Sequence, residues 1–320
     1  MKYSGKQVSV IAPARLHMGF IDMSGALGRH FGSIGVALNE ISTRLTMQQA
    51  EQLTVTGCVV DRAKKCTQQL CQALDVSDCL ALHIETAIPE HVGLGSGTQL
   101  ALAIGSALNA FYDLGLNVRD VARLTDRGQR SGIGIGVFEQ GGLVVDGGRG
   151  EHTVTPPMIA HMVVPEQWRF VLAFDRRGQG LHGKQEVSAF KALPPFPQAQ
   201  AEKLCYLLLM QALPAIAEQD IQRFGDVITQ LQTAVGEHFA SVQGGVFTSQ
   251  DVADAMHWLQ QQGAVAIGQT SWGPTGFCAV DGPERAEQLL QELNARYRDN
   301  PNLEFRVVSA RNSRANVWVS

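Results

Sequence analysis

Alternating apolar and polar positions predict that the chain opens with β-strands. Residues 8–12 are apolar at every second position, and the same period of two recurs at 36–38 and 53–55. This period is typical of a strand that buries one of its two faces. Residues 62–75 carry apolar side chains at helical spacing instead, so the sequence predicts a helix there.

A strand, a glycine-rich loop and a buried helix follow one another in the next part of the chain. Residues 80–84 alternate in polarity, and the predicted strand ends at Pro89. The glycine-rich loop covers residues 93–99, and apolar residues repeat at helical spacing from Leu100 to Phe111. The sequence therefore predicts that a helix begins where the glycines stop.

The second half mixes strand and helix patterns without strict alternation. Pro156 and Pro157 follow a second glycine-rich stretch, and a proline pair favours an extended connection. We therefore expect two domains, 1–160 and 161–320, of the α+β class. The further expected elements are a strand at 169–175, helices over 199–238 (kinked or divided at Pro214) and 249–262, and strand-helix-strand passages around 264–280, 283–297 and 304–319.

Composition and charge narrow the function classes. The 320 residues are 45% hydrophobic and 18% charged with a net charge of -4, which disfavours disorder and a main role in binding nucleic acid or anionic membranes. No signal-peptide core and no clean membrane span occur, so a cytoplasmic protein is expected. The six cysteines form no C-x-x-C pair and lack the usual zinc-ligand spacing.

The glycine-rich loop before the buried helix suits an anion. Glycines let the backbone approach a ligand, and the unpaired N–H groups of a helix N-terminus attract negative charge. The alternative is a glycine turn that only lets the helix pack closely. The candidate binding residues are Gly93, Leu94, Gly95, Ser96, Gly97, Thr98 and Gln99.

Three further segments could join that loop. Residues 13–22 place Arg15, His17 and Asp22 close together after a strand, although an ordinary strand-end loop would explain them as well. The glycine-rich stretch 131–148 contains Glu139 beside backbone expected to be flexible, and 268–280 is a late loop of small residues. Small-residue loops at several strand ends suggest one composite site for a phosphorylated ligand.

The ordered motifs resemble the GHMP kinase superfamily. In detail PARLHMGFIDMSG, RHFGSIGVAL, GLGSGTQLALA, SGIGIGVFEQGGLVVDGG and GLHGKQEVSAF look like the β-ribofuranosylaminobenzene 5'-phosphate synthase family. The resemblance implies a GHMP-kinase-like two-domain fold, with an N-terminal S5-like α/β domain and a C-terminal ferredoxin-like α+β domain. It also implies a place in tetrahydromethanopterin biosynthesis.

Departures from the kinase pattern favour the synthase. The loop has Gly97 and Thr98 where the kinases have Ser-Ala, and Ser131-Gly132 is not closely followed by an acidic residue. An ATP-dependent small-molecule kinase and a catalytically silent ligand-binding member remain the alternatives.

The resemblance implies that phosphoribosyl pyrophosphate condenses with 4-aminobenzoate or 4-hydroxybenzoate, with Mg²⁺ and release of pyrophosphate and CO₂. Arg15 is the first choice as anion clamp, with Arg176, Arg177 or Lys184 as alternatives. His17 and Glu139 fit a base by type, and Asp22 fits a role at Mg²⁺ or in orienting His17. Two aromatic residues, Trp272 and Phe138, either hold the ring or belong to the core, and a homodimer is a further expectation.

Overall fold

The computed structural model describes residues 5–178, 192–271 and 273–320. The strands are β1 (Gln7–Asp22), β2 (Phe31–Gln49), β3 (Thr54–Gly57), β4 (Leu80–Thr86), β5 (Leu143–Asp146), β6 (Met158–Met162), β7 (Trp168–Asp175), β8 (Val265–Gln269), β9 (Gly276–Asp281), β10 (Leu303–Ser309) and β11 (Asn316–Val319). The helices are α1 (Val60–Leu74), α2 (Ser96–Tyr112), α3 (Val118–Leu124), α4 (Ile133–Glu139), α6 (Gln198–Leu207), the π-helix η1 (Leu208–Ala212), α7 (Leu213–Ala217), α8 (Ile221–Gln243), α9 (Gln250–Gln261) and α10 (Pro283–Arg296).

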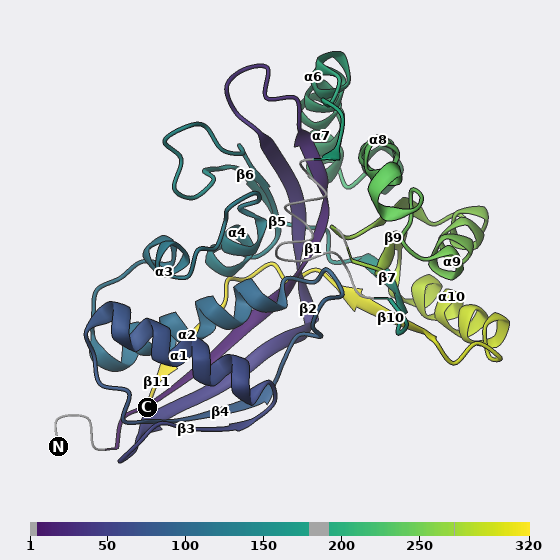
Figure 1. Ribbon diagram of the computed structural model, residues 1–320. Coiled ribbons are helices and arrows are strands. Elements are labelled where there is room, and N and C mark those ends of the chain that lie inside the picture. The colour runs from purple at the N-terminus through teal and green to yellow at the C-terminus, as the bar shows by residue number, and fades with distance from the viewer. Residues whose placement is uncertain (1–4, 179–191, 272) are drawn as a thin grey trace.

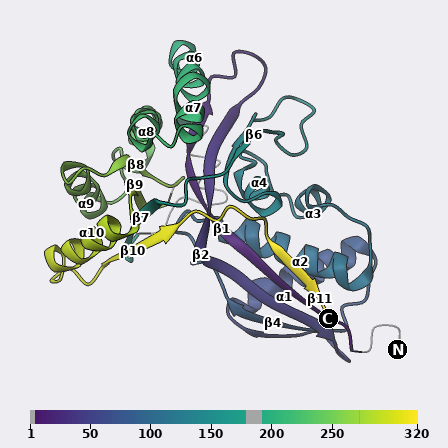
Figure 2. The same ribbon diagram turned by 180° about the vertical axis from the view of Figure 1, so that it is seen from behind.

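The first sheet is built on two long antiparallel strands. β1 and β2 run through the middle of the molecule, and the strand order is β11-β1-β2-β4-β3, with β5 and β6 joined to β2 (Figure 1). The last strand returns to pair with the first, so that Val319 lies opposite Val8 (Figure 2). The two described ends of the chain are therefore neighbours in one sheet.

Helices α1 and α2 cover one face of this sheet (Figure 1). The apolar residues that predicted α2 are buried in it, among them Leu108 and Phe111, and they pack with Val8 and Val10 of β1. α2 begins at Ser96, inside the glycine-rich loop, whereas the sequence had predicted its start behind the last glycine. The loop and the first turn of the helix are therefore one continuous structure.

The second sheet has the order β10-β7-β9-β8. Helices α9 and α10 pack on it through a separate core that contains Met256 and Leu289. α8 lies against both β8 and β1, and its Leu231 belongs to a core cluster with residues of both sheets. The chain passes from the first sheet to the second between β6 and β7, and the domain limits at 160 and 161 stay a prediction.

The α+β class is confirmed, but two local expectations are wrong. Residues 13–22 do not form a loop after a strand, because they continue β1, with irregular pairing at Pro13/Arg15 and His17/Gly19. The stretch 131–148 contains a buried helix, α4, and its glycines permit close packing: a Cβ on Gly132 would lie 3.0 Å from Pro156 Cβ and 3.2 Å from Asp146 Cβ. Dense glycine here reflects tight contact rather than a flexible backbone.

The long helical pattern of 199–238 is divided, as expected. Its parts are α6, the π-turn η1, α7 and α8, and Pro214 lies in the first turn of α7, where a missing N–H costs little. No helix among the described residues is both long and apolar enough to cross a membrane. The cytoplasmic location and the homodimer stay predictions.

Candidate functional site

Arg15 connects three segments that are far apart in the sequence. Its Nη1 donates a hydrogen bond to the carbonyl of Gly93, and its Nη2 lies 3.4 Å from Ser271 Oγ. Its backbone N–H donates to the carbonyl of Leu94 over 3.1 Å. The guanidinium is partly buried where β1, the glycine-rich loop and the hairpin between β8 and β9 meet.

Two threonines of that hairpin fix the same junction. Thr270 Oγ1 donates to Gly93 O at 2.9 Å and accepts from the N–H of His17 at 3.0 Å. Thr275 Oγ1 donates to Val92 O at 2.8 Å. Both threonines are fully buried, so the hairpin sets the position of the loop relative to β1.

The glycine-rich loop depends on two backbone conformations that favour glycine. Gly93 and Gly95 have φ of +82° and +83°, and a Cβ on Gly95 would lie 2.8 Å from Arg15 Cγ. Gly95 is the residue that caps α2, and no side chain hydrogen bond caps this helix end. The N–H groups of its first turn therefore remain suited to an anion.

The other loop residues have unequal roles. Leu94 is 1% exposed and belongs to the core, while Gln99 is fully buried and donates from Nε2 to Gly134 O at 2.7 Å. A Cβ on Gly134 would lie 2.9 Å from Thr98 Cγ2. α4 thus packs directly against the first turn of α2, and Gln99 serves that packing.

His17 is a buried, neutral imidazole beside Arg15. Burial lowers the pKa of His17 well below the ordinary value, and the Arg15 charge lowers it further. A hydrogen bond with the His17 backbone raises the pKa, but by less. Nδ1 accepts the N–H of Gly19 at 3.2 Å, which leaves the proton of the neutral ring on Nε2. Nε2 is buried and has no hydrogen-bond partner among the described residues. It is therefore a hydrogen-bond donor in this state.

Asp22 and Glu139 lie apart from Arg15. Asp22 is seven residues further along β1, roughly 20 Å at strand spacing, and its Oδ1 accepts from the N–H and hydroxyl of Ser24. It lines a pocket of about 350 Å³ that Arg29 and Asp146 also line. The Glu139 carboxylate is 3.1 Å from Arg119 Nη2, in a different pocket of about 910 Å³. The roles predicted for both residues stay predictions.

Asp146, the last residue of β5, is a buried carboxylate that contacts Gly132, the residue before α4. It accepts the N–H groups of Gly132 and Gly148 at 2.8 Å each, as well as the Ser33 hydroxyl. Burial raises its pKa, and these hydrogen bonds oppose the shift. Asp146 therefore fixes the turn from which α4 begins.

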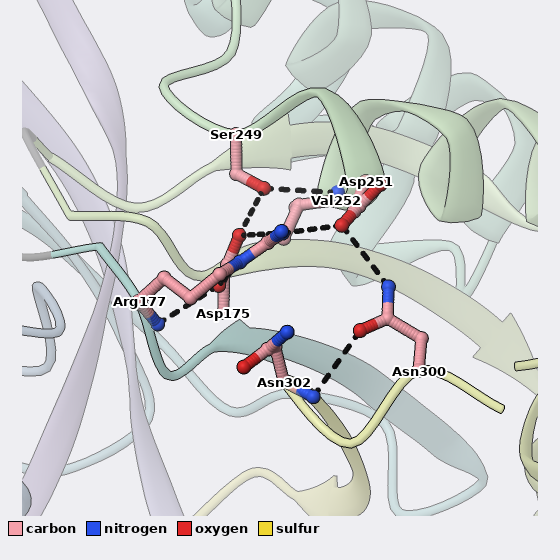
Figure 3. Close-up of polar contacts among 7 residues, drawn as sticks. All are labelled: Asp175, Arg177, Ser249, Asp251, Val252, Asn300 and Asn302. Atoms are coloured by element: carbon pink, nitrogen blue, oxygen red, sulfur yellow. Dashed lines mark hydrogen bonds and ion pairs between the residues drawn. The ribbon is translucent and has the colours of Figure 1, made fainter. Parts of the chain in front are cut away.

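Arg176 and Arg177, the alternative residues for the anion clamp, both form ion pairs within the protein. Arg177 is held by Asp175 and Asp251 in a network that Ser249 and Asn300 extend (Figure 3). Arg176 pairs with Glu304 at 2.9 Å. Lys184 and Trp272 lie outside the described residues. Phe138 is 3% exposed and belongs to the core around α2, which favours the core alternative.

Two arginines that the sequence did not indicate lie at the first turn of α2. A Cβ on Gly97 would lie 3.3 Å from Arg62 Nη2 and 3.4 Å from Arg127 Nη1. Arg62 is in the first turn of α1 and pairs with Glu90, while Arg127 follows α3. No local motif marks them, because the fold brings them together from separate elements.

Known proteins agree with this architecture. The sequence matches the GHMP kinases N terminal domain over residues 61–141 and the GHMP kinases C terminal domain over residues 212–299. The crystal structure of mevalonate diphosphate decarboxylase from Staphylococcus aureus has a similar fold, with a TM-score of 0.65, 16% identity and 98% of each chain covered. A complex of MDDEF with MVAPP, AMPPCP and magnesium has a TM-score of 0.66 at 17% identity, covering 98% of this chain and 99% of that one.

Two archaeal relatives are closer in sequence. The β-ribofuranosylphenol 5'-phosphate synthase of Archaeoglobus fulgidus is 32% identical, covering 84% of this chain and 86% of that protein. The enzyme of the same name from Methanocaldococcus jannaschii is also 32% identical, covering 84% and 88%. The chain therefore belongs to the β-ribofuranosylphenol 5'-phosphate synthase family, within the GHMP kinase superfamily.

Proposed function

We propose that this chain is a β-ribofuranosylphenol 5'-phosphate synthase of methanopterin biosynthesis. The observation that carries the proposal is the 32% identity to synthases of that name over 84% of the chain. The reaction joins phosphoribosyl pyrophosphate to a 4-substituted benzoate. The C–O bond to pyrophosphate breaks, a C–C bond forms at the anomeric carbon, and the ring loses its carboxylate as CO₂. The electron pair of that last bond restores the aromatic ring.

The loop at α2 suits the leaving pyrophosphate. Its departure leaves positive charge on the ribose and gathers negative charge on the phosphates, so fixed donors favour the transition state. The N–H groups of the first turn of α2 and the Arg15 guanidinium are such donors. Gly93 and Ser271 hold Arg15 in place, and Thr270 in turn holds Gly93. This arrangement supports substrate binding by Gly93 and residues 95–98, with the buried Leu94 and Gln99 in supporting positions.

The aromatic acid requires a different environment. A single neutral donor beside an aromatic ring suits a phenol or phenolate oxygen, and His17 has Nε2–H as its donor with the Phe20 ring centred 4.9 Å away. We propose that His17 donates this hydrogen bond to an acceptor that reaches the buried Nε2, and that it does not remove a proton in this tautomer. The phenol in the relatives' names favours 4-hydroxybenzoate over 4-aminobenzoate as the acceptor.

The donor set near the loop fits Mg²⁺ that arrives with the pyrophosphate. Mg²⁺ keeps several waters and uses one or two protein oxygens with substrate phosphates, and no cluster of three metal-ligating side chains exists among the described residues. The Ser96 hydroxyl, in the first turn of α2, is the oxygen that would help to hold it, whereas the Glu90 carboxylate pairs with Arg62. Bound there, Mg²⁺ would neutralise charge on the leaving group.

Product analysis tests the proposed function. The purified protein is incubated with Mg²⁺, phosphoribosyl pyrophosphate and carboxyl-labelled 4-hydroxybenzoate, and labelled CO₂ and the riboside are measured. Matched reactions replace phosphoribosyl pyrophosphate by ATP, or the hydroxy acid by 4-aminobenzoate. We expect CO₂ only with phosphoribosyl pyrophosphate. A phosphorylated acceptor made from ATP without CO₂ release would establish the kinase alternative instead.

A further inference from the structure

We propose that Arg62 and Arg127 complete the anion site at the first turn of α2 and bind the pyrophosphate group of the phosphoribosyl donor. This inference rests on the proposed function for the identity of the donor. It adds two residues that no sequence motif indicated.

The geometry of Gly97 locates the two guanidiniums. The Cβ position of Gly97 is 3.3 Å from Arg62 Nη2 and 3.4 Å from Arg127 Nη1, so both groups face one point on the helix. The equivalent position of Gly95, two residues earlier, faces the Arg15 side chain. Arginines from β1, from the start of α1 and from the segment after α3 therefore surround the same N-terminal turn.

The charges of this group are not balanced by the protein. Arg62 pairs with Glu90, whereas Arg127 forms no ion pair among the described residues. Burial lowers the pKa of Arg62, and the charge of Arg127 lowers it further. Arg127 Nε is buried without a hydrogen-bond partner in the part of the chain that the structure describes. Two cations and one carboxylate leave a net positive charge for a ligand to neutralise.

Pyrophosphate matches these features better than a carboxylate does. Guanidiniums bind phosphate oxygens in two-pronged contacts, and a helix N-terminus supplies N–H groups to the same anion. Pyrophosphate carries several negative charges on adjacent phosphates, so one group can contact Arg15 through one phosphate and the Arg62–Arg127 side through the other. The benzoate has a single carboxylate, which it loses in the reaction.

Calorimetric titration with inorganic pyrophosphate tests the inference without relying on turnover. We compare the wild-type protein with Arg127→Gln and Arg62→Gln, and use Arg298→Gln as the matched control because the Arg298 side chain is 78% exposed. Each loop-side variant should weaken pyrophosphate binding about tenfold or more, as expected for loss of one charged hydrogen bond. The control should bind as the wild type does, and ribose 5-phosphate is titrated in parallel.

Thermal unfolding without ligand keeps the result interpretable. Arg127→Gln removes a like-charge contact, so its melting temperature should equal or exceed that of the wild type. Unchanged pyrophosphate affinity in folded Arg127→Gln overturns the inference. A variant that binds ribose 5-phosphate more weakly but binds pyrophosphate as the wild type does also overturns it. If the wild type binds pyrophosphate in this arginine-dependent way but releases no CO₂, the proposed function fails while the anion site stands.

Discussion

Two groups of arginines in this protein differ in how their charge is neutralised. Arg177 lies between Asp175 and Asp251, and its Nη2 is 2.8 Å from Asp175 Oδ2 (Figure 3). Its charge, with the Ser249 hydroxyl, lowers the pKa of Asp175 to about 2. At the first turn of α2, by contrast, Arg62 and Arg127 face one point with Glu90 as the carboxylate beside them.

The difference separates a structural network from a binding site. In the Arg177 network each charged group already has a partner of opposite sign, so the network can stabilise the second sheet and α9 without a ligand. At the first turn of α2 the arginine cations lie beside the partial positive charge of the helix N-terminus. Their mutual repulsion destabilises the folded protein unless an anion binds. Charge balance, more than arginine content, therefore distinguishes the two regions.

The largest effect is expected at Arg15. Arg15→Lys keeps the charge but loses the planar fork that reaches both Gly93 and Ser271, so kcat/KM should fall about 100-fold or more. The measurement is steady-state CO₂ release with phosphoribosyl pyrophosphate as the varied substrate. Arg176→Lys, in a surface ion pair with Glu304, is the matched control and should retain activity. Full turnover by Arg15→Lys would place Arg15 with the structural arginines.

His17 is expected to give the next largest effect. His17→Gln places an amide donor near the position of Nε2, whereas His17→Asn places one near Nδ1. We expect kcat to fall about 10-fold for His17→Gln, which keeps a donor near Nε2. We expect a fall of about 100-fold for His17→Asn, which loses that hydrogen bond. Equal losses would argue against the assigned donor at Nε2.

The pKa of His17 gives a second test with a definite sign. The folded pKa lies well below 6.5, so the unfolded chain binds more protons as pH falls below about 6.5. Wild-type stability should therefore decrease on acidification through that range, and the His17→Gln protein should lack this component. Urea unfolding at several pH values measures it. Identical pH profiles for both proteins would mean that His17 is not buried as a neutral ring.

Sequence patterns were sufficient where buried positions recur with the regular period of a strand or a helix. The period of two at residues 8–12 and the helical spacing behind residue 99 predicted β1 and α2, and the resemblance supplied the fold. Patterns failed at residues 13–22 and 131–148, where polar or glycine-rich segments are built into the sheet and core by long-range packing. A Gly132 that packs closely against Pro156 and Asp146 looks the same in sequence as a glycine in a loop.

The candidate site shows the same division. Arg15 and residues 93–98 could be identified because a motif marks them. The pair formed by Arg62 and Arg127 could not, since their proximity depends on how α1 and the segment after α3 pack around α2. The sequence did not predict the ion pair between Arg119 and Glu139 either. This ion pair gives Glu139, the candidate base, a partner outside the Arg15 site.

Gly97→Ala sharpens the comparison at the α2 site. Alanine suits a helix better than glycine by about 0.5–1 kcal/mol, but its methyl group would lie 3.3 Å from Arg62 and 3.4 Å from Arg127. We expect stability to be kept while pyrophosphate binds several-fold more weakly. Ser106→Ala, within α2, is the control. Gly115→Ala is unsuitable, because the φ of Gly115 is +72° and alanine would be strained there. Unchanged affinity in Gly97→Ala would indicate that no ligand approaches this turn.

Asp175→Asn tests the balanced network. The folded pKa of about 2 means that Asp175 contributes stability above its unfolded value near 3.8, and that this contribution is lost as pH falls from about 4 to 2. At neutral pH we expect Asp175→Asn to lose about 1–2 kcal/mol, less than the full shift because solvent screens Arg177. Denaturant unfolding at pH 7 and pH 3 measures the difference, which should shrink at pH 3. Activity of the folded protein should not change.

The smallest effect is expected for Glu139, and it decides between two roles. Its carboxylate is 3.1 Å from Arg119 and partly exposed, in a pocket separate from the Arg15 site, so Glu139→Gln should change kcat by less than about threefold. Arg119→Gln should have a similarly small effect, because both variants break the same partly exposed ion pair. Steady-state kinetics of the two single variants and the double variant give the coupling between them. A loss of about 100-fold for Glu139→Gln with none for Arg119→Gln would restore the catalytic role predicted from the sequence. It would also show that charge pairing alone does not mark a residue as structural in this protein.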